Sequence, residues 1–323
     1  MDTLNLIRRR VGAAVLVVGA FYLPFVLSSQ QESLLTRALI FGVMAASLDL
    51  AYGQAGLYSL GHAALAGVGG YTVGLMMVRY GVESFWLLIL AAMVASAVAS
   101  LVFALVSLRA RGLYFILVTI ALGQMLSNLA QSWDYLKTAQ AEAVTGIVMP
   151  AVGFDIPWNS GTTYQFVLVI VVAMMIVIQR LIGSPMGLAF RGSRENDLRM
   201  GALGYDVWRY RVAALVLSGT LCGMSGALFA FHSGLISPTN IGVATSGVLV
   251  LMAIIGGSGT RYGAFLGGIL VTLLQFYAAD WSLERAPLIV GGLFIVTALL
   301  NRHRPRVRAA LAGIVKGRRH ATA

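Results

Sequence analysis

A polar segment in the middle of the chain holds the residues best suited to contact a partner. It reads SPMGLAFRGSRENDLRMGALGYDVWRYR from Ser184 to Arg211 and separates two apolar runs, Tyr164–Ile182 and Val212–Phe231. Five of the 23 Lys and Arg residues and three of the 12 acids lie in it. A basic loop that only fixes membrane topology would carry similar charges, so the residue types alone leave this alternative open.

The same residue types predict one short helix within the segment. Ser193 is suited to cap the helix start, because a serine oxygen accepts hydrogen bonds from free backbone N–H groups. Glu195 and Asp197 then fall in the first turn, where the helix dipole favours acids. Gly204 is suited to end the helix. A capped helix on one aqueous face would offer a compact docking surface.

Asp49 is the one acid in the middle of an apolar run. An ionisable side chain inside a membrane costs free energy, so its presence indicates a function. Arg37 lies twelve residues earlier, too far along a helix to pair with it. A polar lining, a hydrogen bond at a helix break and proton coupling all remain open for Asp49.

The sequence contains no recognisable catalytic constellation. The only lysines are Lys137 and Lys316, and neither lies in a G-x-x-x-x-G-K-[ST] phosphate loop. The four histidines have no metal-ligand spacing, and Ser59 near His62 is more often a packed polar pair than a hydrolase dyad. We therefore expect no cofactor, no metal and no ATP hydrolysis by this chain itself.

Composition places the chain in a membrane. Apolar residues make up 59% of it, charged residues only 11%, and the mean hydropathy is +0.84. A soluble domain carries about 25% charged residues. A membrane-spanning helix needs about 20 mainly apolar residues. The apolar runs of this chain fall at 11–28, 34–52, 57–78, 85–107, 112–132, 163–182, 211–232, 243–258, 263–279 and 286–300. The prediction is one all-α membrane domain over 1–323 with about 8–10 transmembrane helices.

Several runs are shorter than a full span, which indicates tilted, broken or re-entrant helices. The breaks are expected near Gly53–Gly61 and Gly256–Gly263, where glycines interrupt the apolar pattern. Together with Asp49, the candidate residues of the breaks or the pathway are Gly53, Gly56, Ser59, Gly61, His62, Gly256, Gly257 and Gly259. Spacings such as Gly219-x-x-x-Gly223 also predict close helix contacts.

The basic residues predict the orientation. With ten crossings and the N-terminus inside, 19 of the 23 Lys and Arg residues fall on the inner side. This bias is what the positive-inside rule requires. It places both termini, the loop 184–211 and the basic tail 301–323 in the cytoplasm. The net charge of +11 thus predicts topology and a lipid bilayer as partner, with no nucleic acid.

Several motifs resemble those of branched-chain amino acid ABC-importer permeases. Leu48–His62 reads LDLAYGQAGLYSLGH, similar to the signature N-L-x-x-G-x-x-G-x-x-S-x-G-H of that family. RGLYFILVT at 111–119, the polar segment, SGTLCGMSGALFA at 218–230 and LMAIIGGSGTRYGAFL at 251–266 also resemble family blocks in the family's order. The resemblance covers about residues 48 to 270 and points to the second of the two permease types.

This resemblance implies a set of partners and a mechanism. The expected partners are a second permease subunit, two cytoplasmic ATP-binding subunits and a periplasmic substrate-binding protein, in a bacterial inner membrane. ATP would drive alternating access, with Ser193–Gly204 as a rigid lever between the ATPase and the membrane helices. The ATPase-coupling residues would be Ser193, Arg194, Glu195, Leu198, Gly201, Ala202, Leu203 and Gly204.

The sequence also departs from the family pattern, and the departures concern the solute. Asp49 stands where the family usually has Asn, Leu57 where it has Gln, and Val248 where Glu is common. Branched-chain or other hydrophobic amino acids are the expected substrates, with urea, short amides or aromatic acids as alternatives. An ion-coupled secondary transporter would need more intramembrane ligands than Asp49 alone.

Overall fold

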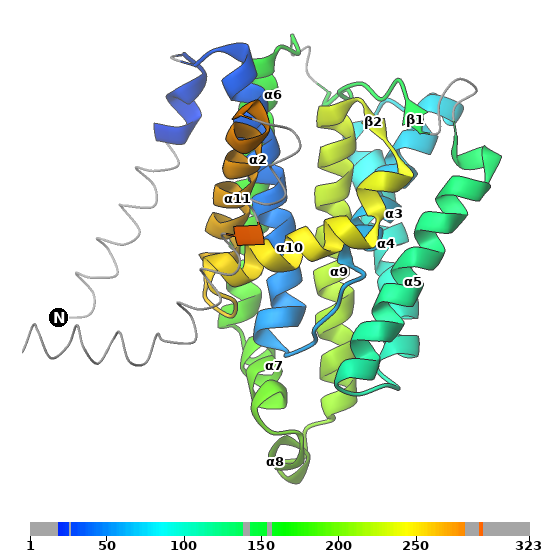
Figure 1. Ribbon diagram of the computed structural model, residues 1–323, viewed down its shortest axis with the longest axis vertical. Coiled ribbons are helices and arrows are strands. Elements are labelled where there is room, and N and C mark those ends of the chain that lie inside the picture. The colour runs from blue at the N-terminus through cyan, green and yellow to red at the C-terminus, as the bar shows by residue number, and fades with distance from the viewer. Residues whose placement is uncertain (1–18, 26, 138–142, 154–156, 282–290, 293–323) are drawn as a thin grey trace, which may run out of the picture. The chain divides into compact units, whose positions relative to one another are not determined.

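The protein is built almost entirely of helices. The structure, a computed structural model, describes residues 19–25, 27–137, 143–153, 157–281 and 291–292 (Figure 1). The chain divides into two compact units, Met1–Leu273 and Leu274–Ala323. In the second unit the described residues are the end of the last long helix and residues 291–292. The basic tail 301–323 lies outside the described residues.

The long helices coincide with the predicted apolar runs. Their bounds are α2 (Ser29–Asp49), α3 (His62–Tyr80), α4 (Phe85–Ser107), α5 (Leu113–Ser132), α6 (Ser160–Gly183), α9 (Val207–Ser233), α10 (Val243–Gly256) and α11 (Gly263–Trp281). The all-α integral membrane fold is confirmed. Five described helices are long and apolar enough to span a membrane: α4, α5, α6, α9 and α2 with its extension to Gln54. The runs predicted at 11–28 and 286–300 fall largely outside the described residues.

The helices of the first unit divide into an inner and an outer set. α3 packs along α9 and α4, while α2 packs against α6 and α9. In their most apolar stretches, α2 and α9 are 78% and 67% buried, whereas α4 and α5 are 33% and 28% buried. The large apolar side chains that α4 and α5 expose therefore suit contact with lipid or with another membrane subunit.

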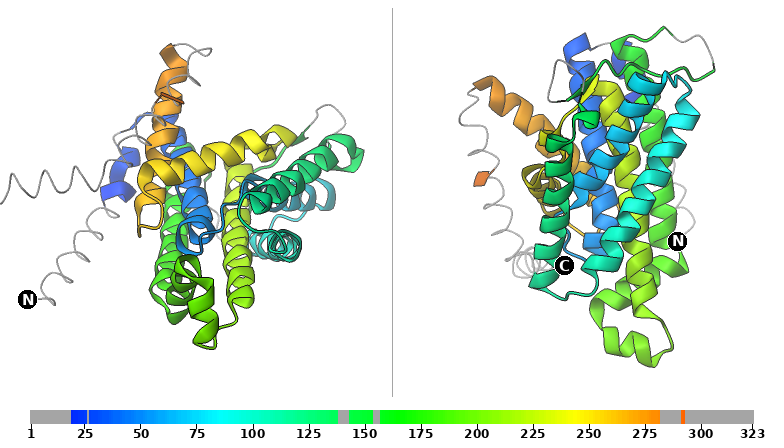
Figure 2. Two further views of the ribbon diagram at one scale, coloured as in Figure 1. Left: turned by 60° about the horizontal axis from the view of Figure 1, so that its bottom comes forward. Right: turned by 90° about the vertical axis from the view of Figure 1, so that its right-hand side faces the viewer.

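The short helix α10 lies crosswise to the long helices (Figures 1 and 2). It has 14 residues, about 21 Å at 1.5 Å per residue, which is too short to cross the hydrocarbon layer of about 30 Å. It packs against α2, α3 and α5. The expectation of a short helix broken near Gly256–Gly263 is confirmed.

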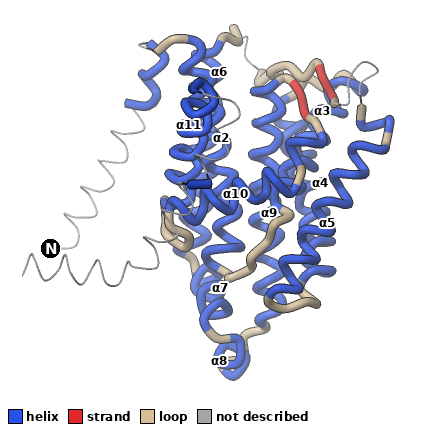
Figure 3. Tube along the Cα trace, viewed as in Figure 1, coloured by secondary structure: helices blue, strands red, loops and turns tan. Residues whose placement is uncertain are grey.

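The two ends of the long helices carry different connections (Figure 3). At one end lie α7 (Pro185–Glu195), α8 (Asp197–Ala202) and the α4–α5 connection with Arg109 and Arg111. At the other end β1 (Val144–Thr145) pairs antiparallel with β2 (Leu235–Ile236). The described 3₁₀ turns are η1 (Leu23–Phe25), η3 (Asp134–Leu136) and η4 (Pro238–Ile241). Which end faces the cytoplasm stays a prediction.

Glycine allows the inner helices to approach closely. A Cβ on Gly226 of α9 would lie 1.9 Å from the carbonyl oxygen of Ala66 in α3, and a Cβ on Gly69 would lie 2.0 Å from the carbonyl oxygen of Gly223. No side chain fits at such distances. Backbone therefore packs directly on backbone between α3 and α9, as small residues permit in membrane bundles.

Candidate functional site: the end segment, the helix breaks and a cavity

The polar segment Ser184–Arg211, called the end segment below, forms two helices, so the predicted single helix Ser193–Gly204 is wrong. The first helix, α7, begins at Pro185, and the Ser184 hydroxyl caps it by accepting from the Gly187 N–H at 3.3 Å. Ser193 is buried inside α7, where its hydroxyl donates to the Phe190 carbonyl. Serine followed by proline is a strong start signal, because proline lacks the N–H that the first turn leaves free. That signal identifies the correct start.

The second helix, α8, presents apolar side chains to the surroundings. Asn196 is its cap and accepts from the Arg199 N–H at 3.0 Å. Gly204 follows the helix with a φ of +85°, so its predicted role as a stop is confirmed. Leu198 is 86% exposed and Leu203 is 72% exposed. Gly201 and Ala202 are also exposed, so these four of the eight predicted coupling residues are uncovered in the described permease.

An ion pair holds this end segment together. The Arg211 guanidinium lies 2.6 Å from Asp197 Oδ1 and also donates to the Ser193 carbonyl at 3.4 Å. Arg211 belongs to α9, so the contact joins the second helix of the segment, the end of the first and the long inner helix. Glu195, in contrast, is exposed and closes α7. Such cross-links suit a segment that moves as a unit with α9.

The structure joins the two predicted helix breaks at Asp49. Both carboxylate oxygens of Asp49 accept from the Gly259 N–H, at 2.9 and 3.0 Å. The amide of Gln54 donates to the Gly259 carbonyl at 3.0 Å. Gln54 belongs to η2 (Leu50–Gln54), a π-helical turn that ends α2. A break early in the chain is therefore bound to the α10–α11 turn, 210 residues later.

Arg194 connects this junction to the end segment. Its guanidinium donates to the carbonyl oxygen of Gly53 in the π-helical turn. A Cβ on Gly53 would lie 2.1 Å from Asp49 Oδ1, so the junction requires a glycine there. Gly56 adopts a φ of +72°, and a Cβ on it would lie 2.8 Å from Arg194 Cγ. Three separately predicted groups thus meet: the acid, the glycine breaks and an arginine of α7.

His62 begins α3 after the break and is fully buried. Its Nε2 lies 2.6 Å from the Ser218 hydroxyl, which donates to the Ser47 carbonyl at 2.7 Å. Because Ser218 donates to Ser47, it accepts from a protonated Nε2 of His62. The Ser59 hydroxyl instead accepts from the Gly61 N–H at 3.3 Å. Ser59 and His62 therefore bind different partners, in agreement with a structural role for each.

The glycines after α10 shape a tight turn. Gly257 ends α10 with a φ of +95°, in the left-handed region that favours glycine. A Cβ on Gly256 would lie 1.9 Å from the carbonyl oxygen of Gly263, at the start of α11. The turn places the Gly259 N–H against Asp49. These predicted break residues thus hold the junction and lie away from the cavity described next.

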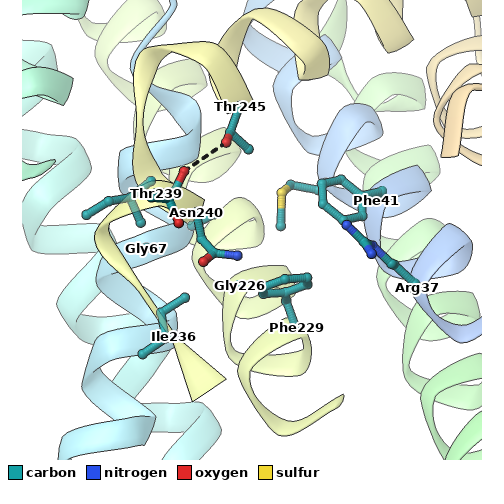
Figure 4. Close-up of a pocket in the computed structure, with 12 residues that line it drawn as sticks. Arg37, Phe41, Gly67, Gly226, Phe229, Ile236, Thr239, Asn240 and Thr245 are labelled. Carbon is teal, nitrogen blue, oxygen red and sulfur yellow. Dashed lines mark hydrogen bonds between the residues drawn. The ribbon is translucent and has the colours of Figure 1, made fainter. Parts of the chain in front are cut away.

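A cavity of about 150 Å³ lies between the inner helices, and it was not predicted from the sequence (Figure 4). Its wall includes Arg37 and Phe41 of α2, Phe229 of α9, and Asn240 of η4. Arg37 lies in the third turn of α2, since that helix begins at Ser29, earlier than the predicted run. An arginine inside an apolar helix was the signal that would have identified this site.

Comparison with known proteins gives the family. The model of the family described as "Branched-chain amino acid transport system / permease component" matches residues 31–298. This chain belongs to that family. The match covers most of the residues, including both helix breaks and the end segment. The permease is thus a membrane component of a transport system, and its multi-pass fold places it in a bacterial inner membrane.

Relatives of both permease types match the chain. The high-affinity branched-chain amino acid transport system permease protein LivM of Salmonella typhimurium is 25% identical over 96% of this chain and 79% of its own length. LivM of Escherichia coli is 25% identical over 94% and 77%. LivH of Escherichia coli is 24% identical over 82% and 90%. The permease is LivM-like. No solved structure gives a significant match.

Proposed function

We propose that this permease is one of two membrane subunits of a binding-protein-dependent ABC importer for branched-chain or other hydrophobic amino acids. A second permease, two cytoplasmic ATP-binding subunits and a periplasmic binding protein would complete it. The observation that carries the proposal is the family match over residues 31–298, to relatives named for branched-chain amino acid transport. The geometry of the end segment adds the route of coupling.

In this proposal α8 docks in a groove of the ATP-binding subunit. Leu198 and Leu203 enter the groove, and the arginines around them lie at its rim. Support comes from the high exposure of both leucines, which other described residues leave largely uncovered. A short helix transmits displacement without bending, so its movement would pass through α7 and through Arg211 into α9.

Arg194 and Asp49 would pass the same movement to the helix breaks. Arg194 binds the π-helical turn, and Asp49 binds the α10–α11 turn. A shift of α7 would therefore act on both breaks together. Alternating access would follow from rearrangement of α2 and α10 around these two hinges. Both termini and the end segment would be cytoplasmic, as the basic residues predict.

Purification and transport test the proposal together. The permease, carrying an affinity tag, is expected to co-purify with a P-loop ATPase when expressed with the products of its neighbouring genes. Reconstituted in vesicles with the loaded binding protein, this complex should take up tritiated leucine only when ATP is supplied. Uptake driven by an ion gradient without the ATPase would contradict the proposal and favour a secondary transporter. Uptake of urea or short amides in place of leucine would contradict only the proposed substrate class.

A further inference from the structure

The cavity combines apolar walls with a few polar groups. Its apolar lining includes Phe41 and Met44 of α2 and Ile241 of η4. Its polar lining includes Arg37 and Asn240. An engineered cavity of about 150 Å³ in another protein admits benzene. A branched aliphatic side chain is no larger, so the cavity volume suits one such group.

Arg37 brings an unpaired positive charge to this cavity. Its guanidinium lies 5.7 Å from the centre of the Phe41 ring. No carboxylate lies within salt-bridge distance of it among the residues that the structure describes. The Arg37 side chain is exposed and lines the cavity, so its guanidinium is accessible to a solute that enters there. Its planar fork of donors fits a carboxylate in two-point contact.

Asn240 faces the same space with further donors. Its Oδ1 accepts from the Ser237 hydroxyl, which leaves the amide nitrogen for another acceptor. Figure 4 shows that nitrogen turned toward the α2 side of the cavity, where Arg37 and Phe41 lie. The lining residues include no Asp or Glu. The donors and the charge thus favour an anionic group over a cationic one.

We propose that this cavity is a solute subsite that binds a hydrophobic amino acid through its carboxylate. Arg37 and Asn240 bind the carboxylate, while Phe41, Met44 and Ile241 contact the aliphatic side chain. The inference rests on the proposed importer function, and it names the substrate chemistry and the residues that select it. It also excludes urea and simple amides as ligands of this subsite, since neither carries a carboxylate.

Replacement of Arg37 and of Arg79 by neutral glutamine tests the subsite. In the reconstituted complex Arg37→Gln should reduce uptake of tritiated leucine about tenfold or more, the loss expected for a charge-assisted hydrogen bond. Arg79→Gln is the matched control, because Arg79 binds Tyr135 and the Lys137 carbonyl, outside the cavity lining. It should keep uptake within about twofold, since exposed pairs contribute little.

An isosteric change at Asn240 gives a second test. Asn240→Asp places a negative charge beside the bound carboxylate, so it should reduce uptake at least as much as Arg37→Gln. Both variants should still assemble with the ATPase and hydrolyse ATP. Wild-type uptake by Arg37→Gln, or an equal loss in Arg79→Gln, would overturn the subsite. If Arg37→Gln does not assemble, normal uptake by Asn240→Asp overturns it.

These outcomes are separate from a failure of the importer function. If the wild-type complex shows no ATP-dependent uptake of leucine, the proposed function itself is wrong. If the wild type transports leucine and the Arg37 and Asn240 variants do so equally well, only the subsite is wrong. Selective loss in the two cavity variants, with Arg79→Gln active, supports both.

Discussion

Replacement of Asp49 tests whether the junction of the two helix breaks matters for transport. A hydrogen bond to a charged group contributes about 1.5–3 kcal/mol, and a neutral one about 0.5–1.5 kcal/mol. Asp49→Asn retains an acceptor for the Gly259 N–H, so we expect a loss of about 1 kcal/mol. Asp49→Leu removes the acceptor and leaves that N–H unpaired, at a cost of about 2–3 kcal/mol.

These energies translate into uptake rates if the junction stabilises a state that transport requires. At about 1.4 kcal/mol per factor of ten, Asp49→Asn should lower uptake by about fivefold and Asp49→Leu by about 30-fold or more. The measurement is ATP-driven uptake per assembled complex in vesicles. Asp134→Asn is the control, since the Asp134 side chain is 98% exposed and its contact with Lys137 is 3.6 Å long.

Two results would contradict this role of the junction. Full activity of Asp49→Leu in an assembled complex would show that the bond between the breaks is not needed. Equal loss in Asp49→Asn and Asp49→Leu would show that the negative charge matters beyond the hydrogen bond. That second result would return a proton-linked role to consideration, because Asn keeps an acceptor for the Gly259 N–H but lacks the negative charge.

Two further predictions concern topology and packing. In a Cys222→Ala background, Leu198→Cys should react with an impermeant thiol reagent only in inverted vesicles and Lys137→Cys only in intact spheroplasts; the reverse pattern would contradict the orientation. Gly226→Ala should lower the free energy of unfolding of the purified permease by about 1–3 kcal/mol, because its Cβ would lie 1.9 Å from the α3 backbone. Gly247→Ala is the control and should change the free energy of unfolding little, because no atom lies within 4 Å of its Cβ. Equal effects of the two substitutions would contradict the packing.

Hydropathy predicted most of the fold, and the reason is physical. A membrane helix satisfies its backbone internally over about 20 apolar residues, so each span leaves a readable run in the sequence. The run at 85–107 coincides with α4, and the run 112–132 differs from α5 by one residue. The glycine breaks could be predicted for the same reason, because they interrupt those apolar runs.

Contacts between distant segments could not be predicted in the same way. Asp49 was recognised as unusual, but its partner Gly259 lies 210 residues away and donates through its backbone, which leaves no mark in residue type. The start of the end segment was misplaced because Ser184, Ser193 and Asn196 all suit a cap. Pro185 directly after Ser184 distinguishes the correct cap, and the fold agrees by burying Ser193 inside α7.

ATP hydrolysis by a complex carrying Gly201→Asp is the sharpest test of the coupling role. No atom lies within 4 Å of a Cβ on Gly201, so the described permease has room for a side chain at this exposed position. Gly204→Asp is less informative, because the φ of +85° strains any side chain. Gly183→Asp, equally open but outside α8, is the control. We predict that Gly201→Asp loses hydrolysis stimulated by the loaded binding protein while Gly183→Asp keeps it. Wild-type stimulation and uptake by Gly201→Asp would remove the coupling role from α8.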